Sequence, residues 1–195
     1  MDTLTLSEGD ALIIVDPQID FLPAGKLAVP HGDEVVPVLN RYIQRFTAKA
    51  LPVFVTRDWH PADHCSFSAQ GGIWPPHCVA GTEGAQFAPG LRVPPAAVVV
   101  SKADSRDKDA YSGFEGTDLA AQLRARGVKR VLVGGLATDY CVLNTVRDAL
   151  AQGFDTVLLL DAVRAVDVKP GDGDAAIAQM LAQRARPLRL EQLAA

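Results

Sequence analysis

Residues 131–141 read VLVGGLATDYC, and they predict a strand, a tight turn and the start of a helix. The apolar run at the start of this stretch is typical of a buried strand, and the two glycines that follow end it. Apolar side chains then recur with helical spacing as far as Leu150. Thr138 or Asp139 is expected to cap this helix, so Cys141 would lie in its first turn.

Cys141 is therefore a candidate nucleophile. The positive end of a helix dipole and nearby free N–H groups favour a thiolate. The same N–H groups could hold an oxyanion formed when the sulfur attacks a carbonyl carbon. A buried structural cysteine is the competing interpretation, and it is the commoner case for a single cysteine.

The composition is that of one globular domain spanning residues 1–195. The chain has 195 residues, 48% of them hydrophobic, and a net charge of −4, so it shows no basic surface for nucleic acid. We find no stretch of transmembrane length, and the acidic N-terminus does not resemble a signal peptide. Three cysteines argue against a disulfide framework and favour the cytoplasm. A small-molecule substrate is expected, and the choice between monomer and homo-oligomer stays open.

Apolar runs and helical patterns alternate along the chain, which predicts a three-layer α/β/α fold. The sheet would be six-stranded and mainly parallel, with its last strand at an edge. The predicted strands are 12–15, 52–56, 97–101, 131–133, 156–160 and 187–190. The predicted helices are 33–49, capped by Asp33, then 117–127, the one after Cys141, and 172–186. The irregular stretch between residues 60 and 95 is long enough to suggest a functional loop.

Four reactive side chains follow strands of this sheet, at the edge where open α/β sheets bind ligands. They are Asp16, Asp58, Lys102 and Cys141. Lys102 could favour a thiolate, and Asp16 could take the thiol proton and pass it to a leaving amine. Taken singly, Asp16 could be a turn residue and Lys102 a solvated lysine. A cysteine–histidine dyad is the competing arrangement.

A second set of residues has the character of a metal site. Asp58 and His60 are two residues apart, so on an extended segment they point the same way, and His77 lies on the same long loop. One carboxylate and two imidazoles suit Zn²⁺, with Fe²⁺ or Mn²⁺ as alternatives. His64 is a further candidate, either as a ligand or as a support for one. Ranked lower are Cys65, Cys78 and His31.

Together these segments resemble the nicotinamidase/pyrazinamidase branch of the isochorismatase-like cysteine hydrolases. The matching segments are 16–21 (DPQIDF), 57–60 (RDWH), 74–78 (WPPHC), Lys102, 111–114 (YSGF) and 134–141 (GGLATDYC). They span nearly the whole chain in the order found in the family. The loop 103–110 is rich in charged residues, and the resemblance does not define its contribution to the pocket.

The resemblance implies a catalytic triad of Asp16, Lys102 and Cys141. It implies a divalent metal ion held by Asp58, His60 and His77, with His64 as a possible fourth ligand. It also implies a cis peptide between Leu136 and Ala137, which would turn the Ala137 N–H toward the oxyanion beside that of Cys141.

The implied reaction is the hydrolysis of nicotinamide to nicotinic acid and ammonia through a thioester, with pyrazinamide as a further substrate. Phe21 and Trp74 would enclose the ring, and Tyr111, Leu136 and Tyr140 would complete the pocket. One rival is a related hydrolase acting on another amide or on a vinyl ether such as isochorismate. Another is a non-catalytic nucleotide- or metal-binding domain. No Gly-x-Gly-x-x-Gly follows the first strand, and a protein that only binds metal would not need Lys102 or Cys141.

Overall fold

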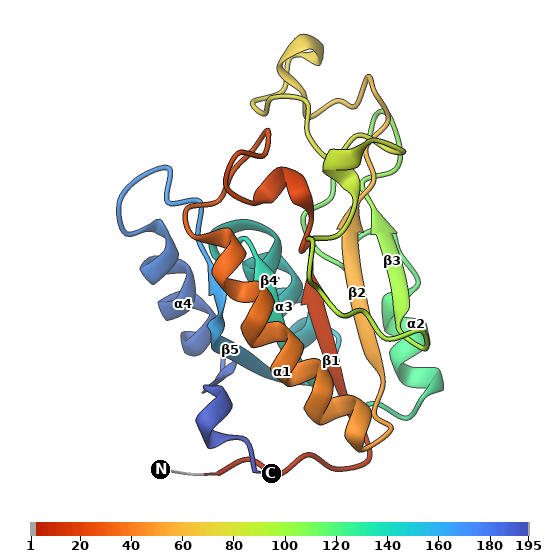
Figure 1. Cartoon of the computed structure of the whole chain (residues 1–195), viewed down its shortest axis with the longest axis vertical. Coiled ribbons are helices and arrows are strands. Elements are labelled where there is room, and N and C mark those ends of the chain that lie inside the picture. Colours follow the sequence, from red (N-terminus) through yellow and green to blue (C-terminus); the bar gives the residue numbers. More distant parts are fainter. Residues whose placement is uncertain (1–2, 195) are drawn as a thin grey trace.

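The computed structural model describes residues 3–194 and shows a six-stranded parallel sheet between layers of helices (Figure 1). The strands are β1 (Asp10–Val15), β2 (Val53–Asp58), β3 (Val98–Lys102), β4 (Arg130–Leu136), β5 (Asp155–Arg164) and β6 (Arg186–Leu188). The helices are α1 (Val35–Ala48), α2 (Leu119–Ala125), α3 (Leu143–Ala151) and α4 (Asp172–Ala182). Every strand pair is parallel, which confirms the predicted fold class.

The strand order β3-β2-β1-β4-β5-β6 places the two central strands, β1 and β4, at the switch point of the sheet. From β1 the chain proceeds outward to β2 and β3, and from β4 it proceeds outward the other way. Connections leave the carboxyl ends of β1 and β4 in opposite directions and open a crevice between them. Asp16 follows β1 at this crevice, and Cys141 follows β4.

The two faces of the sheet are covered by helices with apolar stripes. On one face, Leu39 and Phe46 of α1 are fully buried in a cluster with side chains of β1, β2, β4 and β5. On the other face, Leu119, Val146 and Met180 come from α2, α3 and α4 and pack in a second cluster. Alternate residues of the central strands feed the two clusters, because successive side chains of a strand point to opposite faces.

The start of the helix after β4 differs from the prediction. A wide π turn, η5 (Thr138–Val142), comes first, and the regular helix α3 begins only at Leu143. Neither Thr138 nor Asp139 caps it, so that prediction is wrong. The predicted cap at Asp33 is also wrong, since Asp33 lies within the short 3₁₀ turn η2 (Gly32–Glu34). Cys141 is thus presented by a turn rather than by a regular helix.

Gly135 is required by the close approach of β4 to β1. Its φ is +123°, and a Cβ atom at this position would lie 2.1 Å from the carbonyl oxygen of Val15. Gly90 has φ of +84°, but a Cβ atom there would meet no atom within 4 Å. Both glycines have a positive φ, but only at Gly90 is there room for an added methyl group.

We expect Gly135→Ala to lower the free energy of unfolding by about 3 kcal/mol, because the strands must separate to admit the methyl group. Gly90→Ala is the matched control and should cost about 1 kcal/mol from backbone conformation alone. Urea unfolding of both variants measures the difference. Equal costs would show that β1 and β4 can separate freely.

Candidate functional site

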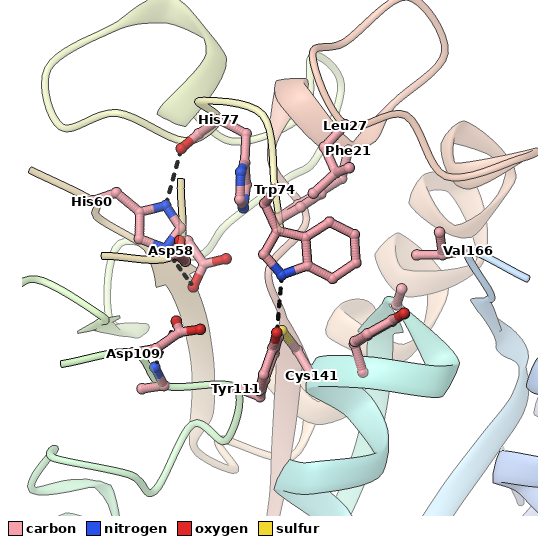
Figure 2. A pocket seen from close by; sticks show the side chains of 14 residues that line it. Phe21, Leu27, Asp58, His60, Trp74, His77, Asp109, Tyr111, Cys141 and Val166 are labelled. Carbon is pink, nitrogen blue, oxygen red and sulfur yellow. Dashed lines mark hydrogen bonds and ion pairs between the residues drawn. The ribbon is translucent and has the colours of Figure 1, made fainter. Parts of the chain in front are cut away.

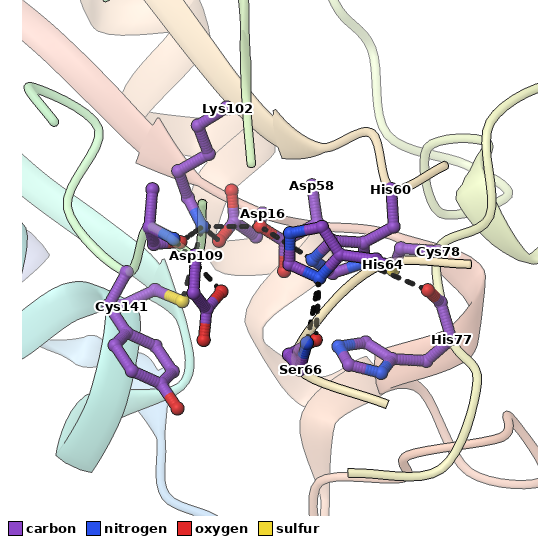
Figure 3. A network of polar contacts seen from close by, with 12 residues as sticks. Asp16, Asp58, His60, His64, Ser66, His77, Cys78, Lys102, Asp109 and Cys141 are labelled. Atoms are coloured by element: carbon purple, nitrogen blue, oxygen red, sulfur yellow. Dashed lines mark hydrogen bonds and ion pairs between the residues drawn. The ribbon is translucent and has the colours of Figure 1, made fainter. Parts of the chain in front are cut away.

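The four strand-end residues meet in one buried cluster (Figure 3). Asp58 and Lys102 are the last residues of β2 and β3, Asp16 follows β1, and Cys141 comes from η5. All four side chains are buried, with residue exposures of 6% or less. The prediction that the carboxyl edge of the sheet gathers them is therefore confirmed by the geometry.

Lys102 lies at the centre of the cluster. Its Nζ atom is 3.0 Å from Asp16 Oδ2, 2.5 Å from Asp58 Oδ1 and 3.4 Å from Cys141 Sγ. It also donates to the carbonyl oxygen of Ala110 at 3.2 Å. One ammonium group thus links the candidate nucleophile to both carboxylates and to the loop that follows β3.

Burial and the charges of the cluster together set the pKa of the Cys141 thiol. Burial is the largest effect and raises the pKa of Cys141; Lys102 opposes this, while the carboxylates of Asp16 and Asp58 add to it. Burial also lowers the pKa of Lys102, but the two carboxylates and Cys141 outweigh it, so the pKa is raised and Lys102 stays charged. Lys102 therefore favours the thiolate as predicted, but burial and the two carboxylates outweigh its effect on the pKa. One positive charge is shared between two negative ones, and the pKa of the Cys141 thiol is raised.

Asp16 is well placed to take the thiol proton. Its Oδ1 accepts a 2.6 Å hydrogen bond from the hydroxyl of Thr56. Its Oδ2 contacts Lys102 but has no well-angled hydrogen bond within the described part of the chain. Burial raises the pKa of Asp16 against the opposing effect of Lys102. A carboxylate oxygen of Asp16 and the sulfur of Cys141 lie within 4.8 Å of each other.

Asp58, His60 and His77 form a group that could hold a metal ion, with one candidate ligand atom from each within 4.8 Å of the others. His60 Nδ1 is 3.0 Å from the carbonyl oxygen of His77, and His77 Nδ1 is 2.8 Å from that of Pro75. Each Nδ1–H can therefore donate to a carbonyl oxygen and leave the Nε2 lone pair free for a metal. Burial, followed by the neighbouring His77, lowers the pKa of His60 to about 3 and keeps its ring neutral. This donor set fits a divalent ion.

His64 is arranged differently from these ligands. Its Nδ1 is 2.7 Å from the hydroxyl oxygen of Ser66, and its Nε2 is 3.2 Å from the carbonyl oxygen of Lys108. Its ring lies against that of His60, with the centroids 4.4 Å apart, and it groups with His60 and Asp109. With both nitrogens engaged, His64 is placed to support His60 rather than to join its metal group.

The lower-ranked candidate ligands Cys65, Cys78 and His31 belong to none of the candidate metal groups in the described residues. Cys78 is fully buried, and burial raises the pKa of its thiol, which suits a core residue. Cys65 is half-buried and belongs to none of the candidate metal groups in the described residues. His31 is exposed and pairs with Glu34.

A pocket joins the metal group to the cysteine (Figure 2). Of the predicted pocket residues, Phe21, Trp74, Tyr111, Ala137 and Tyr140 line it. The indole N–H of Trp74 donates to the Tyr111 hydroxyl at 2.9 Å, and the Trp74 and Tyr140 rings meet edge to face, 5.1 Å between centroids. These aromatic walls can enclose a flat ring.

Leu136 differs from its prediction as a pocket residue. Its side chain is fully buried in the core under α1, and it is not among the pocket-lining residues. A strand residue that points into the core cannot also face the crevice. The peptide that joins Leu136 to Ala137 is cis, as the resemblance implied.

Five further residues, not expected from the sequence, also line the pocket. They are Leu27, Ser66, Asp109, Ala110 and Val166. Of these, only Asp109 carried a signal, because it lies in the charged loop after Lys102. Val166 follows β5, the strand that the sequence pattern ends at residue 160 but the structure extends to Arg164. No local pattern marks these positions, because their role comes from the folding of separate loops onto one crevice.

Comparison with known proteins agrees with this fold. A family model described as the isochorismatase domain matches residues 10–192. The chain therefore belongs to the isochorismatase family.

Within this family, the chain is similar to proteins named as nicotinamidases and pyrazinamidases. It is 39% identical to the nicotinamidase of Escherichia coli (strain K12) over 88% of this chain and 91% of that one. The structure of the pyrazinamidase of Pyrococcus horikoshii in complex with zinc matches with a TM-score of 0.90 and 49% identity, covering 93% and 99% of the two chains. PnC1 of L. infantum in complex with nicotinate matches with a TM-score of 0.91 and 37% identity, covering 98% of each chain.

Proposed function

We propose that this protein is a nicotinamidase, which hydrolyses nicotinamide to nicotinic acid and ammonia and also accepts pyrazinamide. The observation that carries the proposal is that one pocket brings Cys141 together with the Asp58, His60 and His77 group between aromatic walls (Figure 2). The similarity to nicotinamidases and to a zinc-bound pyrazinamidase supports it. A related isochorismatase-like hydrolase acting on another amide is the alternative.

In this proposal, Asp58, His60 and His77 hold one divalent ion, with Zn²⁺ as the first choice and Fe²⁺ or Mn²⁺ as alternatives. An ion held there would act as a Lewis acid toward the ring nitrogen of the substrate and toward water. Phe21 and Trp74 lie beside this group and enclose the ring, which orients the carboxamide toward the sulfur.

The chemical step begins with a proton transfer. As the Cys141 sulfur attacks the carboxamide carbon, its proton passes to Asp16 Oδ2, and Lys102 stabilises the resulting thiolate. The N–H groups of Ala137 and Cys141 hold the tetrahedral oxyanion. Because burial raises the pKa of the Cys141 thiol, the proton transfer accompanies the attack.

The second half of the reaction releases both products. Asp16 returns the proton to the departing nitrogen, and ammonia leaves the acylated Cys141. Water then attacks the thioester carbon while Asp16 takes a proton from it, which yields nicotinic acid and a cysteine that recovers its proton. Each cycle consumes one water and leaves the site as it began.

Chelation tests the proposal directly. We expect purified protein to release ammonia from nicotinamide, to lose that activity after dialysis against a chelator, and to regain it with a divalent ion. Unchanged activity after complete metal removal, checked by elemental analysis, would discard the proposed role of the ion. A metal-loaded protein that releases no ammonia from nicotinamide or pyrazinamide would favour the related hydrolase, and other amides would then be assayed.

The location of the protein in the cell and its assembly state remain predictions. Within residues 3–194, no helix is both long and apolar enough to span a lipid bilayer. The cytoplasmic location and the assembly state, monomer or homo-oligomer, are tested by fractionation and by light scattering.

A further inference from the structure

Asp139 is two residues before the candidate nucleophile, and its carboxylate reaches away from its own helix. Oδ1 accepts a hydrogen bond from the backbone N–H of Val166 at 2.9 Å, and Oδ2 accepts one from the N–H of Asp167 at 2.9 Å. Both partners belong to the loop of residues 165–171, between β5 and α4. One carboxylate therefore ties two successive peptides of this loop to η5.

The rest of the loop is held mainly at its far end. Asp167 has φ of +52°, and its own Oδ1 accepts from the N–H of Gly173 at 2.8 Å. Lys169 donates its N–H to Asp172 at 3.0 Å. The tip is open to solvent, where the side chain of Val168 is 63% exposed. Among these contacts, only the pair made by Asp139 connects the loop to the turn that carries the nucleophile.

We call the two hydrogen bonds that Asp139 accepts from the loop the clamp. The clamp matters because Val166 lines the pocket with Cys141, Tyr140 and Ala137. Figure 2 places Val166 on the side of the pocket away from Asp58 and His60. A ring oriented by the metal group would have its far edge on this side.

We propose that Asp139 is a specificity-determining positioning residue, which fixes Val166 as the wall that limits the size of the ring carboxamide. This inference rests on the proposed function for its substrate, but the clamp itself does not depend on that function. Asp139 takes no part in bond making or breaking.

Asp139→Asn is the sharpest test because it preserves shape and changes one hydrogen bond. An amide oxygen can accept from one of the two N–H groups, while the amide nitrogen faces the other donor. Asp172→Asn is the matched control, because Asp172 also accepts a loop N–H but lies outside the pocket lining.

Hydrogen exchange of the backbone amides measures the two hydrogen bonds of the clamp in the absence of substrate. In Asp139→Asn we expect one of the two amides, of Val166 or of Asp167, to exchange about tenfold faster or more, because the amide nitrogen of Asn cannot accept from it. In Asp172→Asn these two amides should be unchanged. In the wild-type protein both should already exchange more slowly than the amide of Val168. Equal exchange of the three in wild type would overturn the clamp even if the variant failed to fold.

Steady-state kinetics with two substrates test the effect of Asp139 on substrate specificity. In Asp139→Asn we expect KM for nicotinamide to rise about tenfold while kcat changes by less than about threefold, since wall contacts are lost but Cys141, Lys102 and Asp16 are untouched. The ratio of kcat/KM for 5-methylnicotinamide to that for nicotinamide should rise, and Val166→Ala should reproduce that rise. Faster exchange with an unchanged ratio in both variants would overturn the specificity role. If the wild type turned over neither amide, the proposed function would fail, while the exchange result would still decide the clamp.

Discussion

Cys141→Ala is expected to abolish amide hydrolysis, with kcat reduced by about 10⁴-fold or more, because no other group can form the acyl intermediate. No other cysteine lines the pocket among the described residues, so none can substitute for its sulfur. Ammonia release under saturating nicotinamide measures the effect.

The same variant should keep its fold and its binding site. The side chain is small, and the loss of one sulfur atom should cost about 1 kcal/mol of unfolding free energy. Calorimetry should still detect nicotinamide binding, because the aromatic walls and the metal group remain. Cys65→Ala, which removes a half-buried thiol outside the pocket, is the control and should retain full activity. Substantial turnover by Cys141→Ala would refute the nucleophile.

Lys102→Met is expected to have the second largest effect, on stability as well as activity. The ammonium group is buried between Asp16 and Asp58, and its removal leaves two carboxylates without compensation. Breaking a buried ion pair in this way typically costs about 3–5 kcal/mol. Urea unfolding of the metal-free protein measures the loss.

A double variant identifies the cause of that loss. Asp16→Asn combined with Lys102→Met removes one of the orphaned charges, so it should be more stable than the sum of the single effects predicts. Additive losses would mean that the charge of Lys102 contributes little and that its packing dominates.

Lys102→Met also tests how Lys102 affects the pKa of the Cys141 thiol. Burial raises the pKa of Cys141 and Lys102 opposes the rise, so removing Lys102 should raise the pKa further. Alkylation of Cys141, followed against pH by mass spectrometry, should shift to higher pH than in the wild type. An identical profile would remove Lys102 from the stabilisation of the thiolate.

Much of this protein could be predicted from local sequence. Buried parallel strands have to be continuous apolar runs, so the alternation of strands and helices was readable, and it predicted the sheet. Residues that directly follow such strands gather at one edge, so Asp16, Asp58, Lys102 and Cys141 were predicted to meet. His60 and His77 were found because imidazoles near a carboxylate carry a chemical signature of their own.

Other features depend on contacts between segments that are distant in the chain. The pKa of Cys141 is raised first by burial, and Lys102, shared between two carboxylates, only partly opposes this; burial and these distances are not visible in residue spacing. Asp139 has the residue type of a helix cap, but its carboxylate accepts instead from two N–H groups of the loop that follows β5 in the chain.

This difference follows from how the hydrophobic effect acts on a chain. Strand and helix patterns record which side chains must leave water, and that requirement acts on each segment separately. Local sequence was therefore enough for the fold class, the edge of the sheet that carries the site and the chemical identity of its residues. Charge sharing, ring orientation at His64 and the pocket wall at Val166 depend on groups far apart in the chain, and only folding brings these together.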